Sequence, residues 1–299
     1  MVDRKVFFII NKYSGTGFQS KIEGKIIDAC ARLKLEAILE YTQHRGHATE
    51  LARQAAAHGI PRVFAMGGDG TVNETAQGLV GTSTALGILP KGSGNGLARH
   101  LNIPLLFEGA LTLLENYTFK GMDVLKFNDK ISVNVSGIGF DAHVAGKFGK
   151  NGKRGLLGYA KLVMQEFMGF KEFACEAILD GKSYKRNAFI IALANSSQFG
   201  NNALVAPSAS VCDGVMDVCF IKKVPIYAMP AFTTRMFLGK IESSRFVEIV
   251  KASRFEIDFD KPQPYHIDGE PFAPERKFVI EVKPGVLKMI VPLHPGREL

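Results

Sequence analysis

The stretch GGDGTVNE, residues Gly67–Glu74, decides how the first part of this sequence is interpreted. It follows Arg62–Met66, whose apolar residues predict a buried strand, and it runs into Thr71–Val80, whose pattern predicts a helix. Open α/β sheets bind ligands at the carboxyl ends of their strands, where a glycine-rich turn lets the backbone approach phosphate oxygens. Asp69 would repel a phosphate unless a cation such as Mg²⁺ bridges the two. The stretch therefore predicts a site for metal-bound nucleotide phosphates, and a tight loop capped by Asp69 is the alternative.

Strands and helices alternate on both sides of this stretch, through about the first 115 residues. Strands are predicted at Val6–Ile10, Ala37–Tyr41, Arg62–Met66 and Ala85–Leu89, and helices at Phe18–Leu35, His47–His58 and Thr71–Val80. Strands that alternate with helices in this order imply a parallel sheet with helices on its faces. We therefore predict a doubly wound α/β nucleotide-binding domain over residues 1–120.

After Tyr117 the pattern changes, and strands dominate. They are predicted at Met122–Phe127, Ile131–Val135, Phe173–Leu179, Ala188–Ala194, Val215–Ile221, Arg254–Phe259, Phe278–Val282 and Val286–Val291. Helical patterns interrupt them at Leu156–Met168 and Ile226–Leu238. The pairs Asp180-Gly181 and Pro284-Gly285 are typical of hairpin turns. We predict a mostly antiparallel β domain over residues 121–284, and the last residues, 285–299, could rejoin the first domain.

Composition limits the possible partners and the compartment. The 299 residues include 37 Lys+Arg and 29 Asp+Glu, a net charge of +8 that favours anionic partners. No stretch approaches the roughly 20 apolar residues of a membrane-spanning helix. The cysteines show no zinc-type spacing and predict core thiols in a reducing compartment: Cys30, Cys175, Cys212 and Cys219. We expect a cytoplasmic protein that reaches membranes only peripherally and transiently. The basic stretch Lys147–Lys161 is either a membrane contact or a solvated loop.

A second glycine-rich turn, LPKGSGNGLA at Leu89–Ala98, also follows a strand and opens a helix. Its amides and the Ser93 hydroxyl could face the same nucleotide as the first turn. No G-x-x-x-x-G-K-[ST] loop occurs, and no G-x-G-x-x-G follows a strand. Phosphate binding is therefore expected to use a different device.

Four motifs together resemble the diacylglycerol kinase catalytic-domain family, which also includes the sphingosine and ceramide kinases and the bacterial soluble lipid kinases. They are Gly67–Glu74, Gly87–Arg99 (GILPKGSGNGLAR), Asn134–Asp141 (NVSGIGFD) and His266–Glu270 (HIDGE). GGDGT alone is shared with NAD kinases and phosphofructokinases. The resemblance implies an N-terminal NAD kinase-like α/β domain and a C-terminal β-sandwich, with the active site in the cleft between them.

The resemblance also implies roles for single residues. Nucleotide contacts fall on Asn11, Thr42, Gly67, Gly68, Asp69, Gly70, Thr71, Val72, Asn73 and Ser93. Asp69 would help to position the metal and the phosphates. Glu270 corresponds to the proton acceptor of the family, a role that suits phosphoryl transfer to an alcohol. From the residues alone, Asp268-Gly269 is equally a plain hairpin turn and Glu270 a solvated charge.

Two further sites follow from the resemblance. Asp141 corresponds to the acid that contacts the lipid headgroup, although a helix-capping or turn aspartate is the alternative. A structural Mg²⁺ is implied at the Asp213 carboxylate and the main-chain oxygens of Ser210 and Val215, ligands that a hard cation favours. An ordinary Asp-Gly turn is the alternative there. Zinc is not expected at His44 and His47, because the sequence offers no third ligand nearby.

These observations predict an ATP-dependent lipid kinase that uses Mg²⁺ and converts diacylglycerol to phosphatidic acid. The alternatives are a kinase for another lipid, such as a sphingoid base or phosphatidylglycerol, an NAD kinase-like enzyme with a soluble substrate, and a non-catalytic binding module. The expected partners are ATP and a lipid presented at a membrane surface. Nucleic acid is not expected, because no recognition motif appears. The motifs do not encode the oligomeric state, and a homodimer is the alternative to a monomer.

Overall fold

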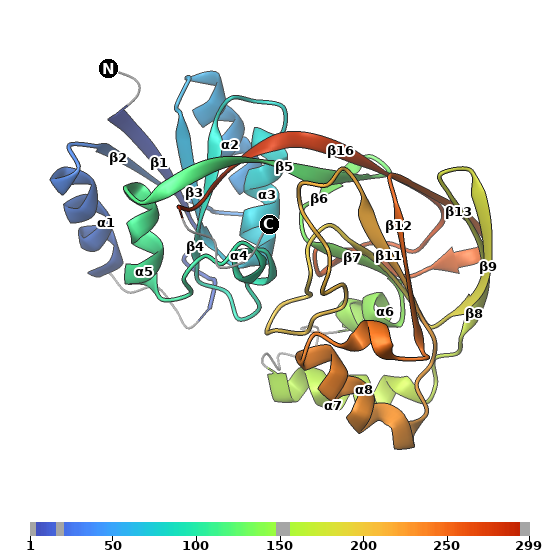
Figure 1. Ribbon diagram of the computed structural model, residues 1–299. Coiled ribbons are helices and arrows are strands. Elements are labelled where there is room, and N and C mark those ends of the chain that lie inside the picture. The colour runs from blue at the N-terminus through green and yellow to red at the C-terminus, as the bar shows by residue number, and fades with distance from the viewer. Residues whose placement is uncertain (1–3, 16–20, 148–155, 294–299) are drawn as a thin grey trace. The chain divides into compact units, whose positions relative to one another are not determined.

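The computed structural model describes residues 4–15, 21–147 and 156–293 (Figure 1). The chain divides into two compact units. Unit 1 comprises Met1–Val124 with Pro284–Leu299, and unit 2 comprises Leu125–Lys283. Unit 2 is therefore an insertion in the chain of unit 1. In the described part of the chain, no helix is long and apolar enough to cross a membrane.

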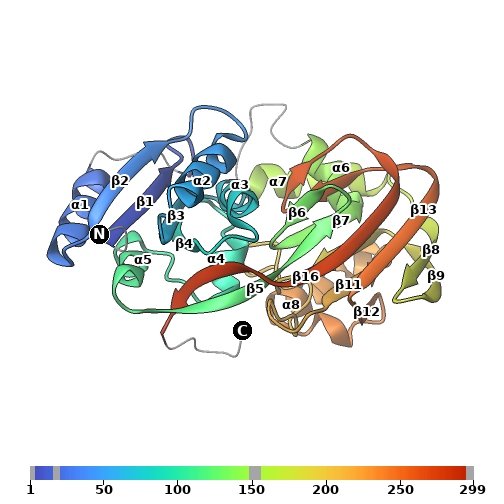
Figure 2. The ribbon, with the colours of Figure 1, turned by 90° about the horizontal axis from the view of Figure 1, so that it is seen from above.

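Unit 1 is built on a parallel sheet in the order β2-β1-β3-β4. Its strands are β1 (Lys5–Ile10), β2 (Glu36–Tyr41), β3 (Arg62–Gly67) and β4 (Ala85–Pro90), and its first helices are α1 (Lys21–Arg32), α2 (His47–Ala57) and α3 (Asp69–Leu79). The short helices α4 (Gly96–His100), α5 (Phe107–Leu111) and η2 (Thr112–Leu114) follow. Helices cover both faces, with α1 and α5 on one side and α2 and α3 on the other (Figures 1 and 2). The predicted doubly wound α/β architecture is confirmed.

Burial explains why these strands form. Every residue of β3 and β4 is buried, and so is β1 from Val6 to Ile10. Strands covered on both faces need continuous apolar runs rather than alternation. Phe8 and Phe64 stack across the sheet with ring centroids 5.5 Å apart. The edge strand β2 is only partly buried. All four strands end at the same edge of the sheet, where the candidate nucleotide residues lie.

Unit 2 is a β-sandwich with mainly antiparallel strands. One sheet has the order β12-β11-β10-β7-β14-β15, formed by β7 (Val135–Gly139), β10 (Ile190–Ala194), β11 (Met216–Ile221), β12 (Val247–Ala252), β14 (Tyr265–Ile267) and β15 (Glu270–Pro271). The other contains β6 (Lys130–Ser132), β8 (Phe173–Leu179), β9 (Lys182–Ala188), β13 (Arg254–Gln263) and parts of β5 (Tyr117–Phe127) and β16 (Glu275–Pro292). Phe127, Ile191, Phe220, Phe255 and Phe278 belong to one core cluster fed by both sheets.

The helices of unit 2 are α6 (Phe140–Lys147), α7 (Leu156–Phe167), η3 (Ile226–Ala228), α8 (Met229–Phe237) and η4 (Ile241–Ser243). Figure 1 shows α7 and α8 at one end of the sandwich. The predicted helix at Leu156–Met168 matches α7 closely. The pattern at Ile226–Leu238 divides into the 3-10 turn η3 and the helix α8.

Two hairpin predictions have opposite outcomes. Asp180-Gly181 joins β8 to β9 with φ values of 46° and 81°, as a tight hairpin requires. Pro284-Gly285 is not a hairpin, and the prediction was wrong, because β16 runs continuously from Glu275 to Pro292. Its first half pairs antiparallel with β13 and its second half meets β4 in parallel, so neither half needs the other as a partner. Gly285, at φ 64°, only bends the strand, and its N–H donates to Asp123 Oδ1 at 2.8 Å.

Two predicted strands are in fact each divided. The predicted strand Ile131–Val135 breaks between Ser132 and Val135, because the N–H groups of Val133 and Asn134 donate to the Asp268 carboxylate instead of to a strand. The predicted strand Ala188–Ala194 breaks at Phe189, where the chain passes from β9 in one sheet to β10 in the other. The strands β9, β12, β14 and β15 were not predicted from the sequence.

Candidate active site

The first glycine-rich turn connects β3 to α3 in unit 1. Gly67 is the last residue of β3, Gly68 is the N-cap of α3, and the helix begins at Asp69. Gly68 supplies no side-chain cap, and the first N–H groups of any helix lack acceptors within the helix. Such N–H groups and the helix dipole favour an anion in front of the turn. Thr71, in the first turn of α3, is held by Asn11, whose Nδ2 donates to Thr71 Oγ1 at 3.0 Å.

The second glycine-rich turn lies directly against the first. Lys91 N–H donates to the Gly67 carbonyl at 2.8 Å. A Cβ added to Gly92 would lie 2.6 Å from Gly68 Cα, and one added to Gly68 would lie 3.2 Å from Gly92 Cα. The first contact is too close for any side chain, so position 92 needs glycine for packing, and the second contact is tight. The two turns therefore form one continuous backbone surface.

Asp69 links the two turns through its side chain. Its Oδ1 accepts the N–H of Gly96 at 2.7 Å, at the start of α4. Asn95, at φ 49°, holds the second turn internally, since its Oδ1 accepts the Gly92 N–H at 3.0 Å and its Nδ2 donates to the Gly92 carbonyl at 2.7 Å. A carboxylate has lone pairs beyond those used in one hydrogen bond, so Asp69 is chemically suited to a metal that is bound by phosphates.

The remaining predicted nucleotide residues lie at the same edge of the parallel sheet or in α3. Asn11 follows β1, and Thr42 follows β2 with its N–H donated to the Ile10 carbonyl at 3.0 Å. Ser93 lies within the second turn. Val72 and Asn73 are buried at 4% and 8% exposure, so their side chains belong to the packing of α3. Asn73 Oδ1 accepts a hydrogen bond from Gln77 Nε2 at 2.6 Å.

Lys91 is a neighbour of this surface that the sequence had not singled out. Its Nζ donates to the Ser14 carbonyl at 2.7 Å and lies 3.5 Å from the Lys12 carbonyl. Burial lowers the pKa of Lys91. The residue thus ties the loop after β1 to the second turn, and its place in KGSGN was the signal that could have found it.

In unit 2, Asp268-Gly269-Glu270 forms a turn between β14 and β15. Asp268 and Gly269 have φ values of 48° and 87°. Asp268 is buried, and its carboxylate accepts the Ser132 hydroxyl at 2.6 Å and the N–H groups of Val133 and Asn134 at 2.9 and 3.1 Å. Three donors on one buried carboxylate fix the turn firmly. Glu270, the next residue but one, is exposed.

Asp141 is connected to this turn through His266. Asp141 Oδ2 lies 3.0 Å from His266 Nε2, and the two side chains are only 11% and 4% exposed. His266 Nδ1 accepts the Gly269 N–H at 3.1 Å, which places the proton of the neutral ring on Nε2, facing Asp141. Gly137 makes room for this contact, because a Cβ there would lie 1.9 Å from Asp141 Oδ2. Hydrogen bonds through His266 therefore connect Asp141, the predicted headgroup acid, to the turn that carries Glu270, the predicted base.

The predicted structural metal loop is bent at Gly214, with φ 76°. Asp213 Oδ1 accepts the Val215 N–H at 3.3 Å, and the Ser210 hydroxyl oxygen accepts the Cys212 N–H at 3.3 Å. Asp213 Oδ2 accepts a hydrogen bond from Lys251 Nζ at 2.9 Å. The oxygen donors suit a hard cation, and a Mg²⁺ ion at this carboxylate would share it with the Lys251 ammonium group.

His44 and His47 have a third possible ligand nearby that sequence spacing did not reveal. Ligand atoms of His44, His47 and Glu50 all lie within 4.8 Å of one another. However, His47 Nδ1 accepts the Gln43 N–H at 3.1 Å, so the neutral ring carries its proton on Nε2. The two imidazole rings also stack with centroids 4.7 Å apart. His47 therefore stabilises the chain just before α2, and in this state neither of its ring nitrogens is available to bind a metal.

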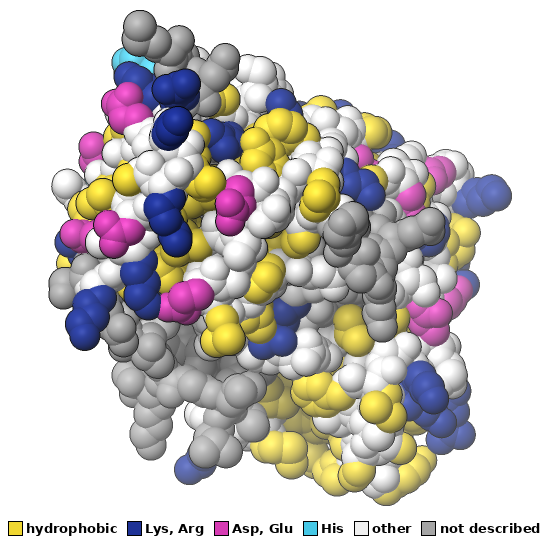
Figure 3. Space-filling view, turned by 60° about the vertical axis from the view of Figure 1, so that its left-hand side comes forward, with side chains coloured by type: hydrophobic (Ala, Val, Ile, Leu, Met, Phe, Trp, Pro, Cys, Tyr) yellow, Lys and Arg dark blue, Asp and Glu magenta, His cyan; other side chains and the backbone are white. Residues whose placement is uncertain are grey.

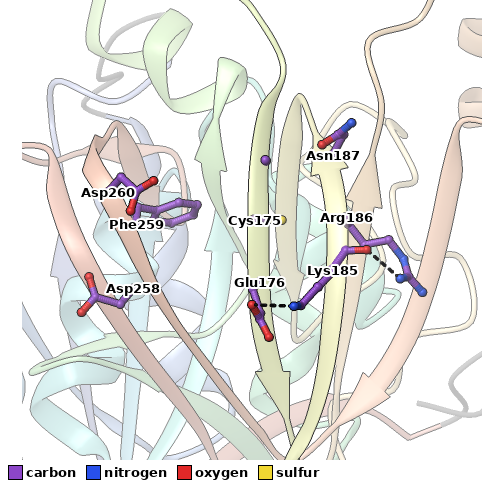
Figure 4. Close-up of a pocket in the computed structure, with 9 residues that line it drawn as sticks. Cys175, Glu176, Lys185, Arg186, Asn187, Asp258, Phe259 and Asp260 are labelled. Carbon is purple, nitrogen blue, oxygen red and sulfur yellow. Dashed lines mark hydrogen bonds and ion pairs between the residues drawn. The ribbon is translucent and has the colours of Figure 1, made fainter.

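A cavity of about 550 Å³ lies elsewhere in unit 2, where β13 separates from β8 (Figure 4). Asp258 and Asp260 approach it from β13, and Glu176 pairs with Lys185 across β8 and β9 at 3.4 Å. Cys175 also lines it, but burial raises the pKa of this thiol to about 11, which keeps it protonated at neutral pH. None of the predicted site residues lines this cavity.

Two family models together cover most of the chain. Residues 134–291 match the YegS C-terminal NAD kinase beta sandwich-like domain, and residues 5–127 match the diacylglycerol kinase catalytic domain. The first-named model covers the sandwich and the second the parallel α/β unit with its paired glycine-rich turns, so these matches, and not the fold alone, identify a two-domain kinase. The chain belongs to the diacylglycerol kinase family of lipid kinases.

Individual relatives agree with this membership. The chain is 31% identical to a Chromohalobacter salexigens protein named "Probable lipid kinase YegS-like", over 84% of this chain and 82% of the relative. It is 24% identical to the diacylglycerol kinase of Bacillus subtilis, over 89% and 90% of the two chains. A crystal structure from Bacillus anthracis str. Sterne, provisionally described as a diacylglycerol kinase, superposes with a TM-score of 0.82 at 25% identity and covers 99% of both chains. The resemblance drawn from the four motifs is thus confirmed.

Proposed function

We propose that this protein transfers the γ-phosphate of ATP to a lipid hydroxyl, with diacylglycerol as the acceptor and phosphatidic acid as the product. The observation that carries the proposal is the frame around Asp268-Gly269-Glu270. A buried carboxylate with three donors and the Asp141–His266 contact hold this turn, while Glu270 remains exposed beside it. A rigid turn with an exposed acid suits the orientation and deprotonation of an alcohol.

In this proposal, the nucleotide binds at the two glycine-rich turns. The N–H groups at the start of α3 and the Ser93 hydroxyl would bind phosphate oxygens, with Asn11 and Thr42 as further contacts. Mg²⁺ would supply the positive charge that phosphoryl transfer requires, and the Asp69 carboxylate would hold it. The contact between the turns supports this role, because it presents both sets of amides from one surface.

Glu270 acts on the acceptor. As the lipid oxygen bonds to the γ-phosphorus, the bond to the bridging oxygen of ADP breaks and ADP leaves, while the hydroxyl proton passes to Glu270. Asp141 would hold the lipid headgroup, with its position set by His266. A structural Mg²⁺ at Asp213, Ser210 and Val215 remains part of the proposal, and its role would be to stiffen the loop before β11.

The test is a phosphorylation assay with γ-labelled ATP and four separate acceptors: diacylglycerol, a sphingoid base, phosphatidylglycerol and NAD. We expect label in phosphatidic acid and little label elsewhere. Label in NAD alone would establish the soluble-substrate alternative, and label in another lipid would keep the lipid kinase while replacing the acceptor. Label in none of the four, from protein that binds ATP, would favour the binding module.

A further inference from the structure

Six large apolar side chains are exposed at one end of unit 2. They lie on α7, η3 and α8 or directly after the two helices, and are at least half exposed: Met164, Met168, Ile226, Tyr227, Phe237 and Leu238. We call these six the α7–α8 surface. In Figure 3, hydrophobic side chains gather at the lower end of the view, where α7 and α8 lie in Figure 1. A group of exposed apolar side chains of this kind normally has a partner.

The fold presents this surface rigidly. The inner face of α7 packs Leu162, Val163 and Phe167 into an aromatic cluster that also receives Met229 from α8. Met164 lies on the opposite, exposed face of α7, and Met168 is the first residue after the helix. The two helices therefore pack against the same aromatic cluster, and the exposed apolar side chains point away from it.

Lys223 joins the end of α7 to the segment that leads into η3. Its Nζ donates to the Phe170 carbonyl at 2.6 Å and lies 4.9 Å from the ring centroid of Phe167. Glu172 accepts the Lys223 N–H at 2.6 Å. Met168 and Ile226 consequently belong to segments that are fixed to each other. Their exposure is not a consequence of a loose loop.

Lys and Arg outnumber acids in the segments that carry the surface, where the exposed Glu172 contacts Lys223. Residues 222–240 contain Lys222, Lys223, Arg235 and Lys240 and no acidic residue. Lys161 precedes Met164 by three positions and so lies on the same exposed face of α7. The acid of α7, Glu166, is paired with Lys147 at 2.7 Å and His143 at 2.9 Å, and these hydrogen bonds lower its pKa.

We propose that the α7–α8 surface docks on an anionic lipid membrane. The inference rests on the proposed function, since a kinase for a membrane lipid must reach the bilayer. Apolar side chains surrounded by Lys and Arg fit the boundary between acyl chains and anionic headgroups. A second copy of the chain fits less well, because a two-fold interface would place this group of cations against itself.

The experiment is a flotation assay with vesicles of phosphatidylcholine alone or mixed with phosphatidylglycerol, without ATP or diacylglycerol. We expect the parent protein to bind the anionic vesicles and to release them as salt rises. The triple variant Tyr227→Ser, Phe237→Ser, Leu238→Ser should lower the partition coefficient about tenfold or more. The matched control, Ile27→Ser, Leu106→Ser, Ile178→Ser, removes three exposed apolar side chains from other places and should change it less than about twofold.

Equal binding by the triple variant and the parent, or no binding by the parent, would overturn the proposal. So would a parent dimer that the triple variant dissociates without loss of vesicle binding, since the surface would then be a self-interface. Because these vesicles contain no acceptor, a failure of diacylglycerol phosphorylation leaves the result readable. As a second readout, the triple variant should phosphorylate detergent-dispersed acceptor at the parent rate and vesicle-embedded acceptor more slowly.

Discussion

Glu270 is exposed, yet the residues before it are among the most tightly held in unit 2. We expect Glu270→Gln, which keeps the size of the side chain and removes the base, to lower kcat about 100-fold or more. The KM for ATP should change little, because no proposed nucleotide contact is altered. Initial rates at saturating lipid and varied ATP measure both constants.

Glu176→Gln is the matched control for this change, since Glu176 is also exposed but lies on β8 away from the turn. It should retain the parent rate. Thermal unfolding of both variants would show that the fold is intact. A Glu270→Gln enzyme with near-parent kcat would remove Glu270 from the mechanism.

Gly137 offers a test of the Asp141–His266 contact. An added Cβ would lie 1.9 Å from Asp141 Oδ2 and 2.8 Å from His266 Nε2, so Gly137→Ala must push the pair apart. We expect a loss of about 1–3 kcal/mol in unfolding free energy from overpacking. If Asp141 holds the lipid headgroup, the KM for lipid should rise about tenfold while the KM for ATP stays constant.

Gly146→Ala is the comparison for that substitution. Gly146 lies in the same helix as Asp141, and its added Cβ would meet only Pro271 Cβ, at 3.9 Å. Its stability and kinetics should match those of the parent. If Gly137→Ala loses stability but keeps both KM values, Asp141 has only a structural role.

At the level of elements, two Asp-Gly turns allow the value of burial to be measured directly. Asp268 in the β14–β15 turn accepts the Ser132 hydroxyl and the N–H groups of the two residues after Ser132, and Asp180 in the β8–β9 turn accepts the Ser253 hydroxyl and the N–H groups of Ser253 and Arg254. Their φ values are 48° and 46°. Asp268 is buried and Asp180 is exposed. Asp268→Asn should cost about 2–4 kcal/mol of unfolding free energy, and Asp180→Asn less than about 1 kcal/mol. Urea unfolding of the two variants measures both; equal costs would show that burial adds nothing to these bonds.

The local sequence predicted an element well where the whole element lies in one kind of environment, such as a strand buried on both faces. The strands β1, β3 and β4 were predicted because both of their faces are buried, so apolar runs such as VFFII identify them. The local sequence was uninformative where residues far away in the chain determine how a segment pairs. Pro284-Gly285 has the sequence of a hairpin turn, and only the structure shows that the strand halves before and after it pair with β13 and β4 instead of with each other. The break at Val133–Asn134 likewise depends on Asp268, more than 130 positions away.

The same limit applies to the candidate site. The glycine-rich turns are recognisable in the sequence, because glycine lets the backbone approach a ligand closely and each turn has several glycines within a few residues. The contact of Gly68 with Gly92, however, depends on neighbouring parallel strands. His266 was quoted within HIDGE but given no role, since its partner Asp141 lies 125 positions earlier. Motifs located the residues, and only the fold showed which of them support one another.

At the level of the whole molecule, buried thiols in both units couple stability to alkaline pH. Burial raises the pKa of Cys30 in α1 and of Cys175 in β8 from 9.0 to about 11, and the pKa of buried Cys219 in β11 rises as well. Below pH 9 the folded and unfolded chains both keep these protons. Between pH 9 and 11 the unfolded chain releases them while the folded chain retains them, so stability falls as pH rises.

Cys30 and Cys175 should each contribute about 1–2 kcal/mol to that loss. Lysines and tyrosines titrate in the same range, so the parent profile alone cannot isolate the thiols. The double variant Cys30→Ala, Cys175→Ala should begin less stable at pH 7.5, because it loses two packed sulfur atoms, and should then lose stability less steeply up to pH 10.5. Cys212→Ala, at a half-buried position, is the control and should follow the parent profile. Urea unfolding midpoints across this range decide the matter: parallel profiles for parent and double variant would mean that the buried thiols do not govern the alkaline limit of the fold.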